Sequence, residues 1–169
     1  MSYFPDLSPY CYHVQKINPN VLSIGWLDKS HTFRQGSTSE ELLKRLWMFC
    51  QWPVQKARGF YDCELCEEAT SPLIVRREDV EIRLGAAELR IPGKNNIIYA
   101  APDLIYHYVT VHEYTPPDEF VEAVLLAPLP NSPDYIQFLD EHDIDYIFRN
   151  NEGEVIAAGG AYTFLQDKE

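Results

Sequence analysis

The sequence predicts an α+β fold in which an antiparallel β-meander is combined with three to four helices. Two observations support this class. Four segments place apolar residues at helical spacing after Ser, Thr or Pro, and a second group of segments is rich in β-branched residues and alternates apolar with polar positions. A chain of 169 residues can bury a core of its own, so we expect a single domain.

The first elements expected are a strand within residues 21–27 and a helix within residues 37–53. Ser or Thr before two glutamates supplies the start signal of this helix. Its apolar stripe consists of Leu43, Leu46, Trp47 and Cys50. Cys50 is therefore expected to be a core thiol, whereas Cys11 lies in a loop rich in Pro and Tyr and has no visible partner.

Residues 72–84, 86–92 and 96–102 form the predicted meander, with a turn at residues 92–96. A helix from about Pro102 should follow and end before Pro116. The next helix is expected to use Thr115 as its cap.

The end of the chain predicts one more helix and a hairpin. Ser132 before Pro133 marks the helix start, and residues 144–159 predict a β-hairpin that turns at Asn-Asn-Glu-Gly. We expect residues 1–126 to form the main domain, and residues 127–169 to add this helix and hairpin, packed on the same domain. The hairpin could complete the main sheet or offer an edge to a second chain.

Charge and hydropathy limit the classes of partner and location. The formal charge of −12 and the pI of about 4.8 argue against nucleic acids and anionic membranes, which need clustered Lys and Arg. The apolar runs are too short to span a bilayer, and the first ten residues lack the basic start and apolar core of a signal peptide. We therefore expect a cytoplasmic protein with reduced thiols.

The most specific chemistry lies in two pairs of residues. Cys63 and Cys66 have the C-x2-C spacing of a zinc knuckle, and His107 and His112 follow with four residues between them. Together they are the Cys2His2 set that tetrahedral Zn²⁺ commonly takes. On an ideal helix the two rings would lie about 140° apart, so they can converge on one ion only if the last helical turn tightens or unwinds. The sequence thus predicts a zinc site that ties a knuckle to a helix.

Two other interpretations of these residues stay open. The first is a redox pair at Cys63 and Cys66, which the acidic neighbours disfavour because they raise thiol pKa values. The second is a fold without metal, in which all four residues have ordinary structural roles. Four good ligands would fill the zinc shell, which favours a structural ion. A catalytic ion would need an open position and a base, for which Glu64 and Glu113 are the candidates.

Two segments of the sequence also resemble motifs of a known family. Arg-Gly-Phe-Tyr-Asp-Cys-Glu-Leu-Cys at residues 58–66 and the segment from Tyr99 to Val124 are similar to motifs of small uncharacterised bacterial proteins that carry a domain of unknown function. The resemblance spans most of residues 3–126 and does not cover the C-terminal hairpin. It implies a site shared at Cys63, Cys66, His107 and His112. It assigns no ligand or acid-base role to Tyr61, where the family usually has His, and it implies no reaction.

Taken together, the residues favour a protein that acts through recognition of another protein. The sequence has no Walker loop, no nucleotide-binding glycine motif, no nucleophile elbow and no H-E-x-x-H motif. An acidic surface would steer the chain towards a basic partner, as in an inhibitor or immunity-type protein. The alternative is a zinc-dependent hydrolase or nucleic-acid-modifying enzyme.

Overall fold

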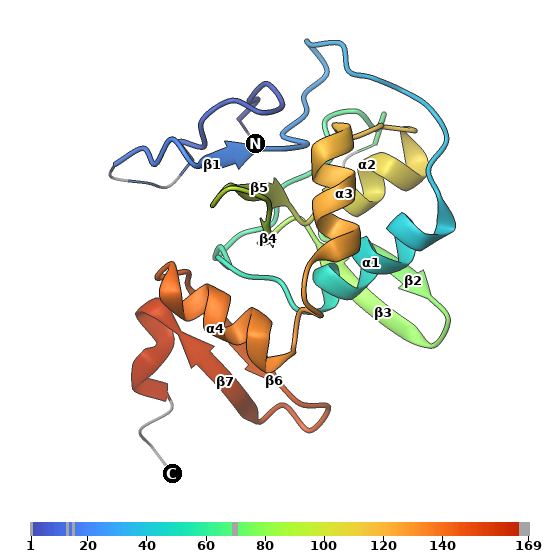
Figure 1. Ribbon diagram of the computed structural model, residues 1–169. Helices are drawn as coiled ribbons and strands as arrows, with labels where there is room; N and C mark the ends of the chain where they lie inside the picture. The colour runs from blue at the N-terminus through green and yellow to red at the C-terminus, as the bar shows by residue number, and fades with distance from the viewer. Residues whose placement is uncertain (1, 13, 15, 69–70, 166–169) are drawn as a thin grey trace.

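The computed structural model describes residues 2–12, 14, 16–68 and 71–165, and within these residues the chain forms four α-helices and seven strands (Figure 1). The elements in chain order are β1 (Val21–Ser23), α1 (Glu40–Gln51), β2 (Leu73–Arg77), β3 (Val80–Leu84), β4 (Glu88–Pro92), β5 (Ile98–Pro102), α2 (Ile105–Val111), α3 (Asp118–Leu126), α4 (Pro133–Glu141), β6 (Tyr146–Arg149), β7 (Val155–Gly159) and a final 3-10 helix, Gly160–Leu165. The predicted α+β class is confirmed.

The strands form three small sheets. β5 lies between β4, with which it is antiparallel, and β1, with which it is parallel, while β2–β3 and β6–β7 are separate antiparallel hairpins. The expected meander is thus antiparallel in each hairpin, but β3 does not pair with β4. Gly85 follows β3 with φ +103°, which turns the chain away before β4 begins.

The helix starts follow capping chemistry in two of four cases. Ser39 caps α1 by accepting from the Leu42 N–H at 3.2 Å, and Ser132 caps α4 by accepting from the Tyr135 N–H at 3.3 Å. The predicted cap at Thr115 is wrong, because the residue before α3 is Pro117, with no side-chain cap.

The start of α2 also differs from the prediction. Pro102 is not the beginning of the helix but the last residue of β5, where it lies opposite Glu88 of β4. The helix starts at Ile105, after the chain has left the sheet. The likeness of Pro102 to a helix-start proline was therefore misleading, since its fixed φ also suits the end of a strand.

The C-terminal elements pack on the rest of the molecule through aromatic side chains. Tyr135 of α4 meets Phe49 of α1 with ring centroids 5.5 Å apart, and Phe148 of β6 meets Trp52 at 5.3 Å. These side chains belong to one apolar core with residues of α1, α2 and α3. Among the described residues β6 and β7 form their own two-stranded sheet and do not extend the sheet of β4 and β5.

A buried ion pair fixes the N-terminal segment against β4. The Arg90 guanidinium lies 2.5 Å from the Glu88 carboxylate, and the Tyr10 hydroxyl donates to the same carboxylate at 2.9 Å. Arg90 also lies over the Tyr10 ring, 4.6 Å from its centroid. Each charge is therefore paired, as burial requires.

In the part of the chain that the structure describes, no helix combines the length and the apolar character that a membrane span needs.

Candidate metal centre

The first half of the site is a tight turn between α1 and β2. The Cys66 N–H donates to the Cys63 carbonyl at 3.4 Å, and the N–H groups of Leu65 and Cys66 approach the Cys63 sulfur. Such N–H groups stabilise a sulfur that carries negative charge. The turn therefore presents both sulfurs on one side, as the C-x2-C spacing predicts.

The second half is the end of α2. His107 lies within the helix, but His112 is its C-cap residue, with φ −103° and ψ 5°. Glu113 then takes the left-handed region at φ 57°, and the N–H groups of His112 and Tyr114 both donate to the Tyr108 carbonyl. Because the helix ends here, the His112 ring is released from its ideal helical direction and turns towards His107.

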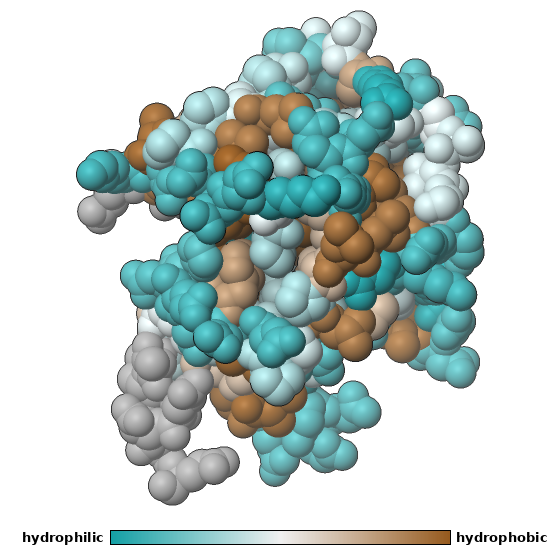
Figure 2. All heavy atoms as spheres, in the orientation of Figure 1, coloured by the Kyte–Doolittle hydropathy of each residue, from teal (hydrophilic) through white to brown (hydrophobic). Residues whose placement is uncertain are grey.

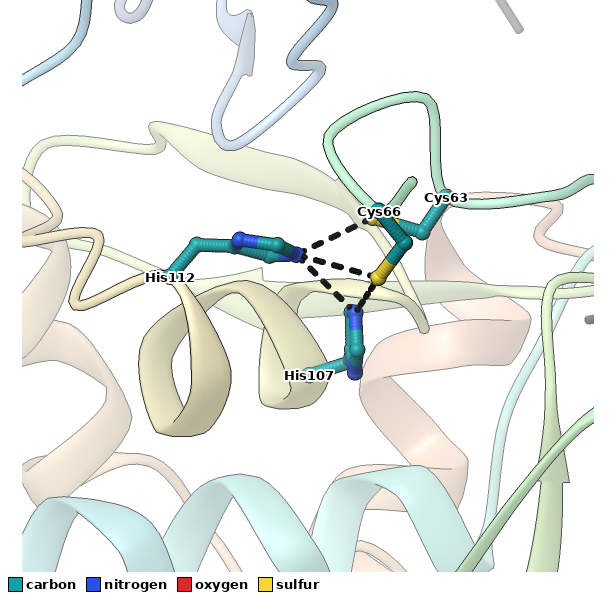
Figure 3. Close-up of side chains that lie close together, drawn as sticks. All are labelled: Cys63, Cys66, His107 and His112. Atoms are coloured by element: carbon teal, nitrogen blue, oxygen red, sulfur yellow. Dashed lines mark hydrogen bonds between the residues drawn. The ribbon is translucent and has the colours of Figure 1, made fainter. Parts of the chain in front are cut away.

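The four side chains meet at a single point (Figure 3). The Nε2 atoms of the two histidines lie 3.2 Å apart. The Cys66 sulfur lies 3.3 Å from Nε2 of His107 and 3.4 Å from Nε2 of His112, and the Cys63 sulfur lies 3.3 Å from Nε2 of His112. All four ligand atoms lie within 4.8 Å of one another.

These separations fit a tetrahedron around one metal ion. Bond lengths of about 2.3 Å to sulfur and about 2.0 to 2.1 Å to nitrogen place an S–N pair about 3.6 Å apart and an N–N pair about 3.3 Å apart. The observed sulfur-to-nitrogen distances of 3.3 to 3.4 Å and the nitrogen-to-nitrogen distance of 3.2 Å are close to these values. The four residues therefore lie close together and could bind a metal ion.

The protonation of the site without metal follows from its burial. Burial, and then the neighbouring His112, lowers the pKa of His107 to about 4, so its imidazole is neutral at pH 7 and has a lone pair to offer. Burial also lowers the pKa of His112, and it raises the pKa of Cys63 to about 11. A bound cation would displace protons from the thiols, because thiolates are the metal-binding form.

Gly85 and Asp103 hold the two halves of the site together. The Tyr61 N–H, two residues before Cys63, donates to the Gly85 carbonyl at 2.7 Å. The Gly85 N–H in turn donates to the Asp103 carboxylate at 2.8 Å, just before α2. A Cβ on Gly85 would lie 2.5 Å from the Tyr61 carbonyl oxygen, so only glycine permits this approach. Sequence reasoning missed both residues, although a glycine directly after a strand was a signal.

The remaining candidates lie outside the cluster. Cys50 is buried in the core, as predicted, and its thiol lies 3.6 Å from the Asp103 carbonyl oxygen. Cys11 is exposed. Tyr61 accepts from the Tyr12 hydroxyl at 2.7 Å and contributes no ligand atom. Glu64 and Glu113 are exposed, and their role as bases stays a prediction.

Comparison with known proteins places the chain in a family without assigning it an activity. A family described as a domain of unknown function, DUF7919, matches residues 2–125. The match includes the knuckle, the ligand helix and the Gly85–Asp103 connection. No curated protein and no solved structure matched the chain. By this match over most of its length, the chain belongs to the DUF7919 family of domains of unknown function.

Proposed function

We propose that Cys63, Cys66, His107 and His112 bind one zinc ion that holds the fold together, in a cytoplasmic protein that acts by recognising another protein. The observation that carries the zinc assignment is the donor set itself. Two sulfurs and two imidazole nitrogens at tetrahedral separations suit Zn²⁺, and two thiolates neutralise its charge.

The structural role rests on the number and origin of the ligands. Four protein ligands complete a zinc shell and leave no position for water. They come from two parts of the chain 41 residues apart in sequence at Cys66 and His107, so an ion would cross-link the knuckle to α2. Cys63 and His107 are buried, which shields the ion from exchange.

Metal content of purified variants tests this assignment. Wild-type protein should contain one zinc per chain. Cys63→Ser and His112→Ala should each lose most of the zinc, because three remaining ligands bind the ion less tightly than four. Cys11→Ser and His31→Ala are matched controls, since both residues are exposed and lie outside the cluster. Wild-type protein without stoichiometric zinc, or full zinc in both ligand variants, would refute the site.

A groove beside α3 supports the recognition role. A cavity of about 250 Å³ is lined by Tyr99, Ala123 and Leu126, with Glu119 and Glu122 beside them. Leu126 is 69% exposed, and Figure 2 shows hydrophobic side chains gathered in the region of α3. A contiguous exposed apolar patch bordered by charged residues is a common feature of interaction sites.

The charges around the groove indicate the chemistry of its partner. Glu119 and Glu122 add negative charge in a chain whose formal charge is −12. Among the described residues that line the groove, Lys94 is the one cation, and it pairs with Glu122 at 2.6 Å. We therefore assign to the groove a basic protein partner that inserts an apolar side chain, in the manner of an inhibitor or immunity protein and its target.

Binding to a panel of purified basic bacterial toxins and nucleases tests this role. A true partner should bind more weakly at high salt, and Leu126→Arg should weaken it at least about tenfold by removing an anchor and adding repulsion. Ile156→Arg is the matched control, because Ile156 is 56% exposed on β7, away from the groove. Absence of binding across the panel, or equal loss in the two variants, would count against the groove.

Folding of the same variants, measured beside their metal content, separates the structural role from a catalytic one. A zinc enzyme would need one ligand to exchange for water, with Glu64 or Glu113 as the base. Removal of a structural ion should unfold the knuckle and the end of α2. Loss of zinc without any change in folding would instead favour the enzymatic alternative.

A further inference from the structure

A second cavity differs from the rest of this acidic molecule in its charge. Its volume is about 270 Å³, and it lies between the segment after α1 and the end of β3. Its polar lining residues are Lys56, Arg83 and Asp103, while Phe60, a proline and three alanines supply apolar walls. It contains none of the four metal-site residues.

The two cations of this cavity are Lys56 and Arg83. Neither Lys56 nor Arg83 forms an ion pair or a side-chain hydrogen bond with the described part of the chain, and both are accessible to solvent. Five other cations pair with carboxylates: Arg34, Arg76, Arg77, Arg90 and Lys94.

The surroundings of Lys56 disfavour its positive charge. Partial burial lowers the pKa of Lys56, and the nearby charge of Arg149 lowers it further. Arg149 itself donates to the Gly153 carbonyl and adds no carboxylate. An anion in the cavity would therefore relieve an unfavourable arrangement of positive charge.

Asp103 supplies the cavity with only part of a negative charge at neutral pH. Its carboxylate is buried and accepts from the backbone N–H groups of Gly85 and Ala86, at 2.8 and 3.4 Å. Burial raises its pKa to about 7, so near neutral pH it is only partly ionised. Its hydrogen bonds are with the backbone, and within the described residues it bonds neither Lys56 nor Arg83.

We propose that this cavity binds a small organic anion, whose carboxylate or phosphate lies between Lys56 and Arg83 and whose apolar body lies against Phe60. Lys and Arg are the side chains that bind such groups by charge-assisted hydrogen bonds. Phe60 is 42% exposed and offers an aromatic surface. A volume of about 270 Å³ lies just below the usual range for small-molecule sites and selects a small ligand.

An NMR titration of the protein as purified, with its metal in place, tests this site. The probes are benzoate, phenyl phosphate, inorganic phosphate and the neutral benzyl alcohol. The two aromatic anions should cause saturable shifts at the amides of Ala57, Phe60 and Ala86. Lys56→Gln and Arg83→Gln should each weaken binding about tenfold or more, because each removes a charge-assisted hydrogen bond.

Lys29→Gln is the matched control, since Lys29 is an exposed cation outside the cavity, and it should bind like wild type. Three results would overturn the proposal: no saturable shifts with either aromatic anion, equal binding of benzyl alcohol and benzoate, or wild-type affinity in both cavity variants. Inorganic phosphate that binds as tightly as phenyl phosphate would overturn the role of Phe60. Since no metal-site residue is altered, failure here is distinct from failure of the zinc assignment.

Discussion

At the scale of single residues, the chemistry of the site was easier to predict than its support. The ligands could be recognised from residue type and spacing alone: two cysteines at C-x2-C spacing and two histidines near a helix end. Gly85 and Asp103 act through backbone contacts with residues distant in the sequence. No local pattern encodes such contacts, so the structure was needed to find them.

Replacing Gly85 by alanine should lower stability by about 2 kcal/mol or more. The new Cβ would lie 2.5 Å from the Tyr61 carbonyl oxygen, at a backbone φ of +103°. Gly153→Ala is the matched control, since Gly153 also has a positive φ but nothing within 4 Å of its Cβ. Urea unfolding compares the two. Equal losses would mean that the contact with Tyr61 contributes nothing.

Asp103 should make stability depend on pH in a defined window. Its folded pKa is about 7 against an ordinary 3.8, so the folded state binds more protons between these values. Stability contributed by the protonated group is full below about pH 4 and falls by a few kcal/mol as pH rises to about 7. Asp103→Asn should flatten this part of the curve. Unfolding free energies at several pH values measure the difference, and parallel curves for the two proteins would contradict it.

At the scale of elements, the helices were predicted better than the sheets. Ser39 and Ser132 marked the starts of two helices, because their side-chain oxygens accept hydrogen bonds from nearby backbone N–H groups. The pairing of strands depends on contacts far apart in the chain. Alternation could therefore predict the strands near β2 to β5, but not that β1 joins β5 in parallel or that β3 and β4 separate.

The caps give a direct comparison between a confirmed and a corrected prediction. Ser132→Ala should lower stability by about 1 kcal/mol, because the Tyr135 N–H loses its acceptor. Thr115→Ala should cost clearly less, since Thr115 does not cap α3. Thermal or urea unfolding measures both. A larger loss for Thr115→Ala would show that the element starts are misassigned.

At the scale of the whole molecule, one core connects the N-terminal and C-terminal parts. Phe49 and Trp52 meet Tyr135 and Phe148 across this connection. The sequence predicted that residues 127–169 pack on the main domain, but it left the mode of packing open, because aromatic contacts between distant segments are not visible in local spacing.

Phe148→Ala should therefore destabilise the whole chain. Phe148 is 1% exposed, and truncating a buried Phe costs about 3 to 5 kcal/mol. Unfolding should stay a single transition in both fluorescence and circular dichroism, because the parts share a core. Ile156→Ala is the control at an exposed position of the adjacent strand and should cost little. Two separate transitions would indicate that the C-terminal hairpin folds on its own.

At the metal site, Cys63, Cys66, His107 and His112 are proposed to hold one zinc ion through two sulfurs and two nitrogens. X-ray absorption at the zinc edge of wild-type protein as purified measures this shell directly. We expect two sulfur ligands at about 2.3 Å and two nitrogen ligands at about 2.0 to 2.1 Å, with no further ligand. A protein without zinc, or a shell without sulfur, would contradict it.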